Sequence, residues 1–589
     1  MSYRAPLADI SFALNQGAGM TDALREGLFG DLGQDVVEAV LEEAGRFAAD
    51  VIAPLNAVGD RHGAIFRDGA VVTPPGWKEA YRDWSAAGWN GLAAPTDWGG
   101  QGLPHALNAA CIEMWNAASM AFGIGPVLTM GAIEALAAYG SDELRAAYLP
   151  KLVSGEWMGT MQMTEPQAGS DVGALRTRAE RAGDGTYRIT GQKIFITYGE
   201  HDLTDNIVHF VLARLTDAPL GTKGISLFLI PKFLPDDNGA PGKRNDVRAH
   251  AIEHKLGIHA SPTCTMIFGD AGGATGYLVG EENRGLACMF TMMNLARLSV
   301  GLQGVGIAER ALQQALAYAR ERRQGRALGA KESSPIIAHP DVARMLMTMR
   351  ALTQAARSIC YATAIAIDRS HRTTGEEDRK AADVRASLLT PVAKAFSTDI
   401  GIEVASLGVQ VHGGMGFIEE TGAAQHYRDA RIAAIYEGTN GIQAIDLVTR
   451  KLPLEDGAVL QTYLAELRGI AKSVQASNDA SFGTTGARLS ETTDALERAS
   501  RWLQERLRHA PADALAGATP YLRLFGHAAG SCLLAQQAVA AKRDADPSAA
   551  ARVALARFFA ENIAVQSVSL CAMITEGAQT ITSASFPAE

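Results

Sequence analysis

Cysteine is scarce in this sequence, and the cysteines that it has stand far apart. The 589 residues include six of them, and none forms a CxxC pair. This spacing argues against a zinc site and against a disulfide framework, and it is typical of a protein from a reducing compartment. We therefore expect neither a metal site nor disulfide bonds.

Positively charged residues are also fewer than negatively charged ones. The formal net charge is −10, so nucleic acid and anionic membrane surfaces are poor default partners. The opening MSYRAPLADISFALNQ lacks the basic start and apolar core of a signal peptide. No uncharged apolar run appears long enough for a membrane helix. These absences favour a cytoplasmic enzyme with neither nucleic acid nor a membrane as its partner.

What is present is an ordinary globular composition, 47% hydrophobic and 20% charged, in a chain too long for one compact core. Residues 1–160 and 286–452 show the apolar spacing of helices, and residues 453–589 form a further helical stretch. Residues 161–285 differ, because TYRITGQKIFITYG, NIVHFVLARL and GISLFLIPKF are short, β-branched and bounded by turn residues. We predict an α+β protein of four domains with these bounds, whose β domain is antiparallel.

Two glycine clusters are candidates for phosphate binding, and only the second remains one after closer comparison. GLQGVGIAER (301–310) fails the dinucleotide fingerprint, because Glu309 occupies the third glycine position and no strand precedes it. Its small residues instead favour close packing of a helix. VHGGMGF (411–417) is either a loop between helices or a place where backbone N–H groups approach a pyrophosphate. Arg322 and Arg323 could supply the opposing charge or could cap a solvated helix end.

The segment IYEGTNGIQ (435–443) places one carboxylate, Glu437, before a Gly-Thr-Asn-Gly run. Such an acid can complement a helix start that Thr439 or Asn440 caps. It can also be a catalytic base held in an apolar pocket. These nine residues alone favour the first interpretation.

Four stretches occur in an order typical of one known family. They are MTEPQAGSDVG (163–173), KIFITYG (193–199), RLSVGLQGVGIAERALQQALAYARERR (297–323), and QVHGGMGFIEET with YRDARIAAIYEGTNGIQ (410–443). Through them the sequence resembles the acyl-CoA dehydrogenase family over about residues 30–452. The resemblance implies a helical N-terminal domain, a central antiparallel β domain and a C-terminal four-helix bundle, followed here by an extra helical domain. It also implies FAD as cofactor, an acyl-CoA as substrate and an electron-transfer flavoprotein as electron acceptor.

The resemblance also implies the residues that bind FAD. Met163 and Thr164 correspond to contacts of the flavin ring, Thr197 to a contact near flavin N5, and Phe195 stands where many members have tryptophan. Arg322 matches an arginine that reaches the FAD of a neighbouring subunit, although Gly325 replaces the aromatic residue usual a few positions later. The predicted cofactor-binding residues are Met163, Thr164, Ser170, Phe195, Thr197, Arg322, Gln410, Gly414, Thr439 and Gln443.

In the family pattern, Glu437 is the base that takes the α proton of the acyl thioester while the β hydrogen leaves as hydride to the flavin. Some members place the base just before the arginine equivalent to Arg297, and that position here is Ala296. Glu437 is therefore the predicted catalytic residue. The predicted substrate-binding residues are Ser170, Arg297, Tyr436 and Gly438.

The extension after residue 452, with the opening YRAPLADISFAL, resembles a long bacterial subgroup of the family. This implies a homodimer, with a homotetramer possible, and a short-chain or 3-(methylthio)propanoyl-CoA substrate. Two alternatives remain: an acyl-CoA oxidase, and a flavin-binding module of the same fold that is not a dehydrogenase. DNA binding by the tail is disfavoured, since residues 453–589 hold twelve Lys and Arg against fourteen Asp and Glu. The ending FPAE is no peroxisomal address, which favours a dehydrogenase.

Overall fold

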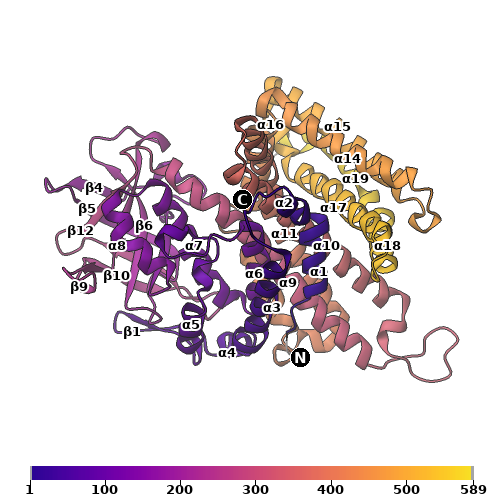
Figure 1. The fold of residues 1–589 in the computed structure, drawn as a ribbon, viewed down its shortest axis with the longest axis horizontal. Helices are drawn as coiled ribbons and strands as arrows, with labels where there is room; N and C mark the ends of the chain where they lie inside the picture. Colours follow the sequence, from indigo (N-terminus) through magenta and orange to yellow (C-terminus); the bar gives the residue numbers. More distant parts are fainter. Residues whose placement is uncertain (1–2, 585–589) are drawn as a thin grey trace.

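The computed structural model describes residues 3–584, and it combines one large β-sheet with helical regions before and after it. Figure 1 shows the sheet at the left, the long helices of residues 285–412 in the middle, and the C-terminal helices in orange and yellow at the upper right. The predicted α+β architecture is confirmed.

A series of helices precedes the sheet. Two of them, made largely of Ala, Met, Leu and Ile, are almost wholly buried because they are apolar on all sides. The elements are α1 (Leu7–Phe12), α2 (Met20–Arg25), α3 (Gln34–Phe47), α4 (Leu55–His62), the hairpin β1 (Ile65–Arg67) and β2 (Ala70–Val72), α5 (Trp77–Ala86), α6 (His105–Ala118), α7 (Met120–Tyr139) and α8 (Asp142–Val153).

The three segments with strand character form β5 (Tyr187–Thr197), β6 (Asn206–Leu215) and β7 (Ile225–Pro231). The main sheet runs β10-β11-β5-β12-β7-β6-β3, with β4 beside β5 and β6. The remaining strands are β3 (Trp157–Gln162), β4 (Arg178–Arg181), β10 (Val247–Ile252), β11 (Thr263–Phe268) and β12 (Ala274–Val279), with β8 (Phe233–Pro235) and β9 (Pro241–Arg244) as a separate hairpin.

The prediction of a purely antiparallel domain needs one correction. β3 pairs with β6 in parallel over its whole length, and β4 pairs with the end of β6 in parallel as well. All other pairings in the described sheet are antiparallel. Alternation of side chains marks a strand but carries no information on its direction, so the sequence could not reveal this.

Three long helices follow the sheet: α9 (Gly285–Glu321), α10 (Pro340–Arg372) and α11 (Glu376–His412). The glycines of α9 allow the close packing that their spacing predicts. A Cβ atom on Gly301 would lie 2.5 Å from the Ala393 carbonyl oxygen of α11, and one on Gly306 would lie 2.9 Å from the Glu113 carbonyl oxygen of α6. The short helices α12 (Ala423–Ala430) and α13 (Asn440–Asp446) complete this part of the chain.

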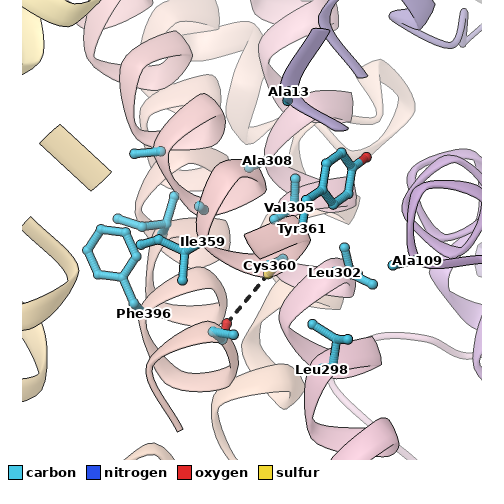
Figure 2. Packing of buried hydrophobic residues seen from close by; sticks show 14 of the residues in the cluster. Ala13, Ala109, Leu298, Leu302, Val305, Ala308, Ile359, Cys360, Tyr361 and Phe396 are labelled. Atoms are coloured by element: carbon cyan, nitrogen blue, oxygen red, sulfur yellow. Dashed lines mark hydrogen bonds between the residues drawn. The ribbon is translucent and has the colours of Figure 1, made fainter. Parts of the chain in front are cut away.

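Figure 2 shows the core that this packing encloses. Leu298 and Leu302 of α9 lie on the side of Ala109 of α6, with Cys360 of α10 between them and Phe396 of α11. A polar contact of 3.3 Å joins Cys360 Sγ to Ser397 Oγ of α11, so even the thiol is used to hold the helices together.

The C-terminal extension packs against the outside of the helical bundle, mainly through α17. The Arg523 guanidinium of α17 lies 2.8 Å from the Glu403 carboxylate of α11, and Gln537 donates to Ser358 Oγ of α10 at 2.7 Å. Its helices are α14 (Ala458–Ala476), α15 (Thr485–His509), α16 (Pro511–Ala516), α17 (Ala518–Arg543), α18 (Ala549–Phe558), α19 (Ser567–Glu576) and α20 (Ala578–Thr582).

Three helical stretches are long and apolar enough to cross a membrane by length and composition: Met120–Tyr139, Gly285–Glu321 and Ala549–Glu576. The prediction from the sequence concerned uncharged runs and so passed over these stretches, because isolated charges such as Glu134 interrupt them without making them polar. In α7, 83% of the most apolar window is buried inside the protein, so this helix serves as core packing.

We expect Gly304→Ala to destabilise the protein. A Cβ atom at this position would collide with the Ser397 carbonyl oxygen of α11, and overpacking of this kind costs about 1–3 kcal/mol. Thermal unfolding of the variant should show a lower midpoint than the wild type. Gly469→Ala in α14 is the matched control, since no atom lies within 4 Å of its added Cβ. An unchanged midpoint in Gly304→Ala would contradict the close α9–α11 contact.

Candidate active site

Glu437 lies in a tight loop just before α13. Its φ is +55°, and that of Gly438 is +83°. A left-handed conformation costs a residue with a side chain roughly 1–2 kcal/mol, so the surrounding contacts must hold it. Gln443 Nε2 does so by donating to the carbonyl oxygens of Glu437 (3.3 Å) and Gly438 (3.2 Å).

The geometry separates the two interpretations of Glu437. Thr439 caps α13, because its hydroxyl accepts from the Ile442 N–H at 3.2 Å. The Glu437 carboxylate takes no part in the cap. Its Oε2 atom is buried and has no hydrogen-bond partner within residues 3–584. A buried carboxylate without a structural partner is available for chemistry.

Two cations face this carboxylate. Burial raises the pKa of the Glu437 carboxyl, and the charges of Arg297 on α9 and Lys394 on α11 oppose that rise. Arg297 Nη1 also lies 3.9 Å from Asp446 Oδ2. Arg297 therefore both acts on the Glu437 carboxylate and forms an ion pair with α13.

Tyr436 lies in the same pocket and contacts α9. Its hydroxyl donates to Gln303 Oε1, which fixes the ring against the helix that also carries Arg297. Burial raises the pKa of the Tyr436 phenol well above its ordinary value, so the phenol stays neutral at working pH.

The loop after β3 holds the residues predicted to contact the flavin. Glu165 organises it, because its carboxylate accepts from Lys193 Nζ at 2.8 Å and from the Thr177 N–H at 3.0 Å. Lys193 also donates to the Met163 carbonyl oxygen at 3.1 Å, and Asp171 accepts from the Gly173 N–H at 3.0 Å. Glu165 and Asp171 thus hold the loop in place.

The donor set of this region fits a flavin. The hydroxyls of Thr164, Ser170 and Thr197 make no hydrogen bond to any residue in the described chain. Phe195 is 59% exposed and has a φ of +59°. Free hydroxyls beside an exposed aromatic ring suit a planar heteroaromatic ligand with polar edges. Met163 packs on the apolar cluster that also contains residues of α7, the sheet and the start of α9.

Arg322, Gln410 and Gly414 lie elsewhere. Tyr318 stacks on His412 with 4.5 Å between ring centroids, so the end of α9 meets the end of α11 there. Arg297 and Arg322 are 25 residues apart (322 − 297) on one helix, or about 37 Å at the α-helical rise. Within one chain the structure does not bring these three residues to Glu437.

Sequence reasoning missed the polar residues that support the base. Lys394, Gln303 and Asp446 are all buried and all surround the Glu437 loop. The signal for Lys394 was a single charge inside the apolar run TPVAKAF of a long helix, since an unpaired lysine is seldom buried without a reason.

Comparison with known proteins identifies the family. Models of the N-terminal, middle and C-terminal domains of acyl-CoA dehydrogenase match residues 34–156, 160–271 and 283–452, and an acetyl-CoA dehydrogenase C-terminal-like model matches residues 463–585. The chain belongs to the acyl-CoA dehydrogenase family. It is an oxidoreductase acting on CH–CH groups, and FAD is the cofactor of this family, as the sequence predicts.

Among acyl-CoA dehydrogenases, the chain is 46% identical to 3-methylmercaptopropionyl-CoA dehydrogenase of Ruegeria pomeroyi over the full length of both. It is 36% identical to butyryl-CoA dehydrogenase of Syntrophomonas wolfei, with 79% of this chain and 78% of that protein covered. An acyl-CoA dehydrogenase of Bacillus anthracis, solved with FAD, shares the fold with a TM-score of 0.74 at 22% identity, covering 95% of this chain and 93% of that one.

For this acyl-CoA dehydrogenase, Glu437→Gln should abolish reduction of the flavin by acyl-CoA. The amide keeps the shape of the side chain but cannot take a proton, and loss of a general base typically costs about 10²–10⁴-fold in rate. Anaerobic stopped-flow absorbance measures the rate, and the visible spectrum should show that FAD remains bound. Glu420→Gln, on the exposed turn Glu419–Thr421, is the matched control. Near-normal reduction by Glu437→Gln would show that the base lies elsewhere.

Proposed function

We propose that this protein oxidises a short acyl-CoA to the 2-enoyl-CoA, with 3-(methylthio)propanoyl-CoA as the leading substrate, and passes the electrons to an electron-transfer flavoprotein. The observation that carries the proposed chemistry is the Glu437 carboxylate, whose buried Oε2 atom has no hydrogen-bond partner within residues 3–584 and whose negative charge Arg297 and Lys394 stabilise. The choice of substrate is supported by the 46% identity to the Ruegeria pomeroyi enzyme, which extends over the full length of both chains.

The residues around Glu437 suit α,β-dehydrogenation. Glu437 takes the α proton of the thioester, and the β hydrogen leaves with its electron pair as a hydride. FAD, when bound, supplies the acceptor for that hydride. Negative charge develops on the thioester oxygen as the α proton leaves, so a fixed donor must meet it. The Glu437 N–H donates to no acceptor within residues 3–584, and it is the donor that we assign to this role.

We also propose that two copies of the chain assemble as a homodimer in a reducing compartment such as the cytoplasm. Arg322, Gln410 and Gly414 lie too far along α9 and α11 to serve the flavin beside Glu437 of the same chain. They are exposed at the surface, where they can reach the flavin of a second subunit. All six cysteines are free and buried, which agrees with a reducing compartment.

The test of the substrate is an anaerobic titration of the purified yellow protein with a panel of acyl-CoAs. The flavin absorbance should bleach with 3-(methylthio)propanoyl-CoA and butanoyl-CoA but not with palmitoyl-CoA, because the relatives from Ruegeria pomeroyi and Syntrophomonas wolfei are named for these short substrates. Bleaching by palmitoyl-CoA alone would reject the short-chain proposal. A flavin that none of these thioesters reduces would reject the dehydrogenase function for this panel and favour the flavin-binding module.

The test of the electron acceptor starts from the substrate-reduced protein. Addition of oxidised electron-transfer flavoprotein should restore the flavin absorbance at least ten times faster than air-saturated buffer does. Hydrogen peroxide formed in equal amount to substrate consumed, at the same rate as turnover, would instead identify an acyl-CoA oxidase.

A further inference from the structure

Lys394 is a buried cation with no assigned role. It lies in the middle of α11 with no exposed surface, and its neighbours Val392, Ala393, Ala395 and Phe396 are equally buried. Removing an ammonium from water is costly unless charges or hydrogen bonds compensate it. The position of this lysine therefore calls for a partner.

The direct partner of Lys394 is Asn440, the first residue of α13. Lys394 Nζ donates to Asn440 Oδ1 at 2.9 Å, and this is its one hydrogen bond within residues 3–584. The Asn440 amide nitrogen in turn donates to Asp399 Oδ1 at 2.7 Å and to the Ala395 carbonyl oxygen at 3.1 Å. Hydrogen bonds with neighbouring residues of α11 thus hold Asn440, which follows Glu437 by three positions.

These hydrogen bonds fix the position of the Glu437 loop. Thr398 Oγ1 completes the set of contacts, 3.0 Å from Asn440 Nδ2. Because Asn440 is held on α11 and Gln443 holds the carbonyl oxygens of the loop, the left-handed turn at Glu437 is fixed from its C-terminal side. A Lys394 side chain without charge or donor would leave Asn440 Oδ1 with one donor fewer.

The charge of Lys394 also acts on the base. An ammonium has three N–H groups, and a neutral amide accepts only one of them here. The largest attractive charge on Lys394 is that of Glu437, followed by that of Asp399, while Arg297 repels it. The Asp446 carboxylate partly balances the charge of Arg297. The hydrogen-bond partner of Lys394 is the Asn440 amide, which is neutral.

We propose that Lys394 is a positioning residue for the base: it holds the Glu437 loop through Asn440 and supplies positive charge that keeps the Glu437 carboxylate ionised in an apolar site. This inference rests on the proposed role of Glu437. It goes beyond that role, because it assigns to a residue that does not touch the substrate the control of the protonation of the base.

The direction of the pH dependence follows from the charges. Glu437 must be ionised to take a proton, so activity falls as the pH falls through its pKa. Burial raises that pKa and Lys394 lowers it, so removal of the lysine charge moves the acid limb to higher pH. Burial also lowers the pKa of Lys394 to about 7. The lysine charge is thus present below pH 7, where the base needs it, and fades above.

Other charges around the pair contribute to the profile and stay constant among the Lys394 variants below. Those that face Glu437 and Lys394, or the residues bonded to them, are Arg297 of α9, Asp399 and Glu403 of α11, Asp446 of α13, Arg450 and Lys451 after it, and Arg523 of α17.

The experiment measures the limiting rate of flavin reduction by 3-(methylthio)propanoyl-CoA against pH in the holoenzyme. Lys394→Met should move the acid limb up by at least one pH unit, which is about a tenfold lower rate on that limb, and should stay below the wild-type rate at high pH because Asn440 loses its donor. Lys394→Gln keeps a donor for Asn440 without the charge and should show the same shift. Lys394→Arg keeps the charge and should stay within 0.3 of the wild-type midpoint.

Lys451→Met is the control for loss of a positive charge nearby. Its ammonium donates to Ser387 Oγ at 2.7 Å and lies near Asp446, so its removal should leave the midpoint in place. A purely structural role for Lys394 would lower the rate equally at all pH values without a shift, and that result would overturn the proposal. An equal shift in the Arg variant would overturn it as well.

A second readout does not depend on turnover or on the flavin. The C=O stretch of the protonated Glu437 carboxyl is assigned by difference infrared spectroscopy as the band lost in Glu437→Gln, and its intensity is titrated with pH. The midpoint should rise in Lys394→Met and Lys394→Gln relative to the wild type. If Met disrupts folding, the Gln and Arg variants carry the same comparison, and equal midpoints in all of them reject the proposal.

The two levels of inference fail separately. A wild-type flavin that no acyl-CoA reduces, or full activity in Glu437→Gln, overturns the proposed function. Loss of activity in Glu437→Gln together with an unshifted profile in the Lys394 variants overturns only the role of Lys394.

Discussion

The close approach of α9 to α11 is the contact on which the site depends. Gly301 and Gly304 face the backbone of α11 at Ala393 and Ser397, with no room for a Cβ atom. The approach fixes the distance between the two helices that carry Arg297 and Lys394. Without it the Glu437 carboxylate would not have a cation on each helix within range of its charge.

The site places several charged groups where removal from water is energetically unfavourable. A carboxylate, an arginine and a lysine are removed from water together, and hydrophobic replacements would often give an equally stable or more stable protein. The backbone at Glu437 adds a left-handed turn. Strain and buried charge at one place are expected where function rather than stability determines the residues.

The C-terminal extension takes part in this arrangement. α13, which follows the base, packs against α11 on one side and α17 on the other. The Arg523–Glu403 pair and the contact of Gly526 with Phe396 join the extension to α11. The extension therefore covers the helix behind the base, so that the Glu437 loop is held from two domains.

The sequence by itself determined the order of helices and strands and the family, and it singled out Glu437 as the proposed base. Strand periodicity located β5, β6 and β7, because alternation and β-branching are local properties. The combination of TEPQAGSD with YEGTNGIQ pointed to Glu437 and to the flavin loop, because those motifs act through residues close together in the chain.

Only the tertiary structure decided which distant residues meet. The parallel pairing of β3 with β6, the separation of Arg322 from Glu437 and the meeting of Lys394 with Asn440 all depend on how long elements pack, and no local pattern carries that information. The burial of Met120–Tyr139 belongs to the same class, since its composition fits a membrane as well as a protein core. Lys394 marks this limit most clearly: the sequence shows a lone lysine in an apolar helix, and only the packing shows that it faces the base.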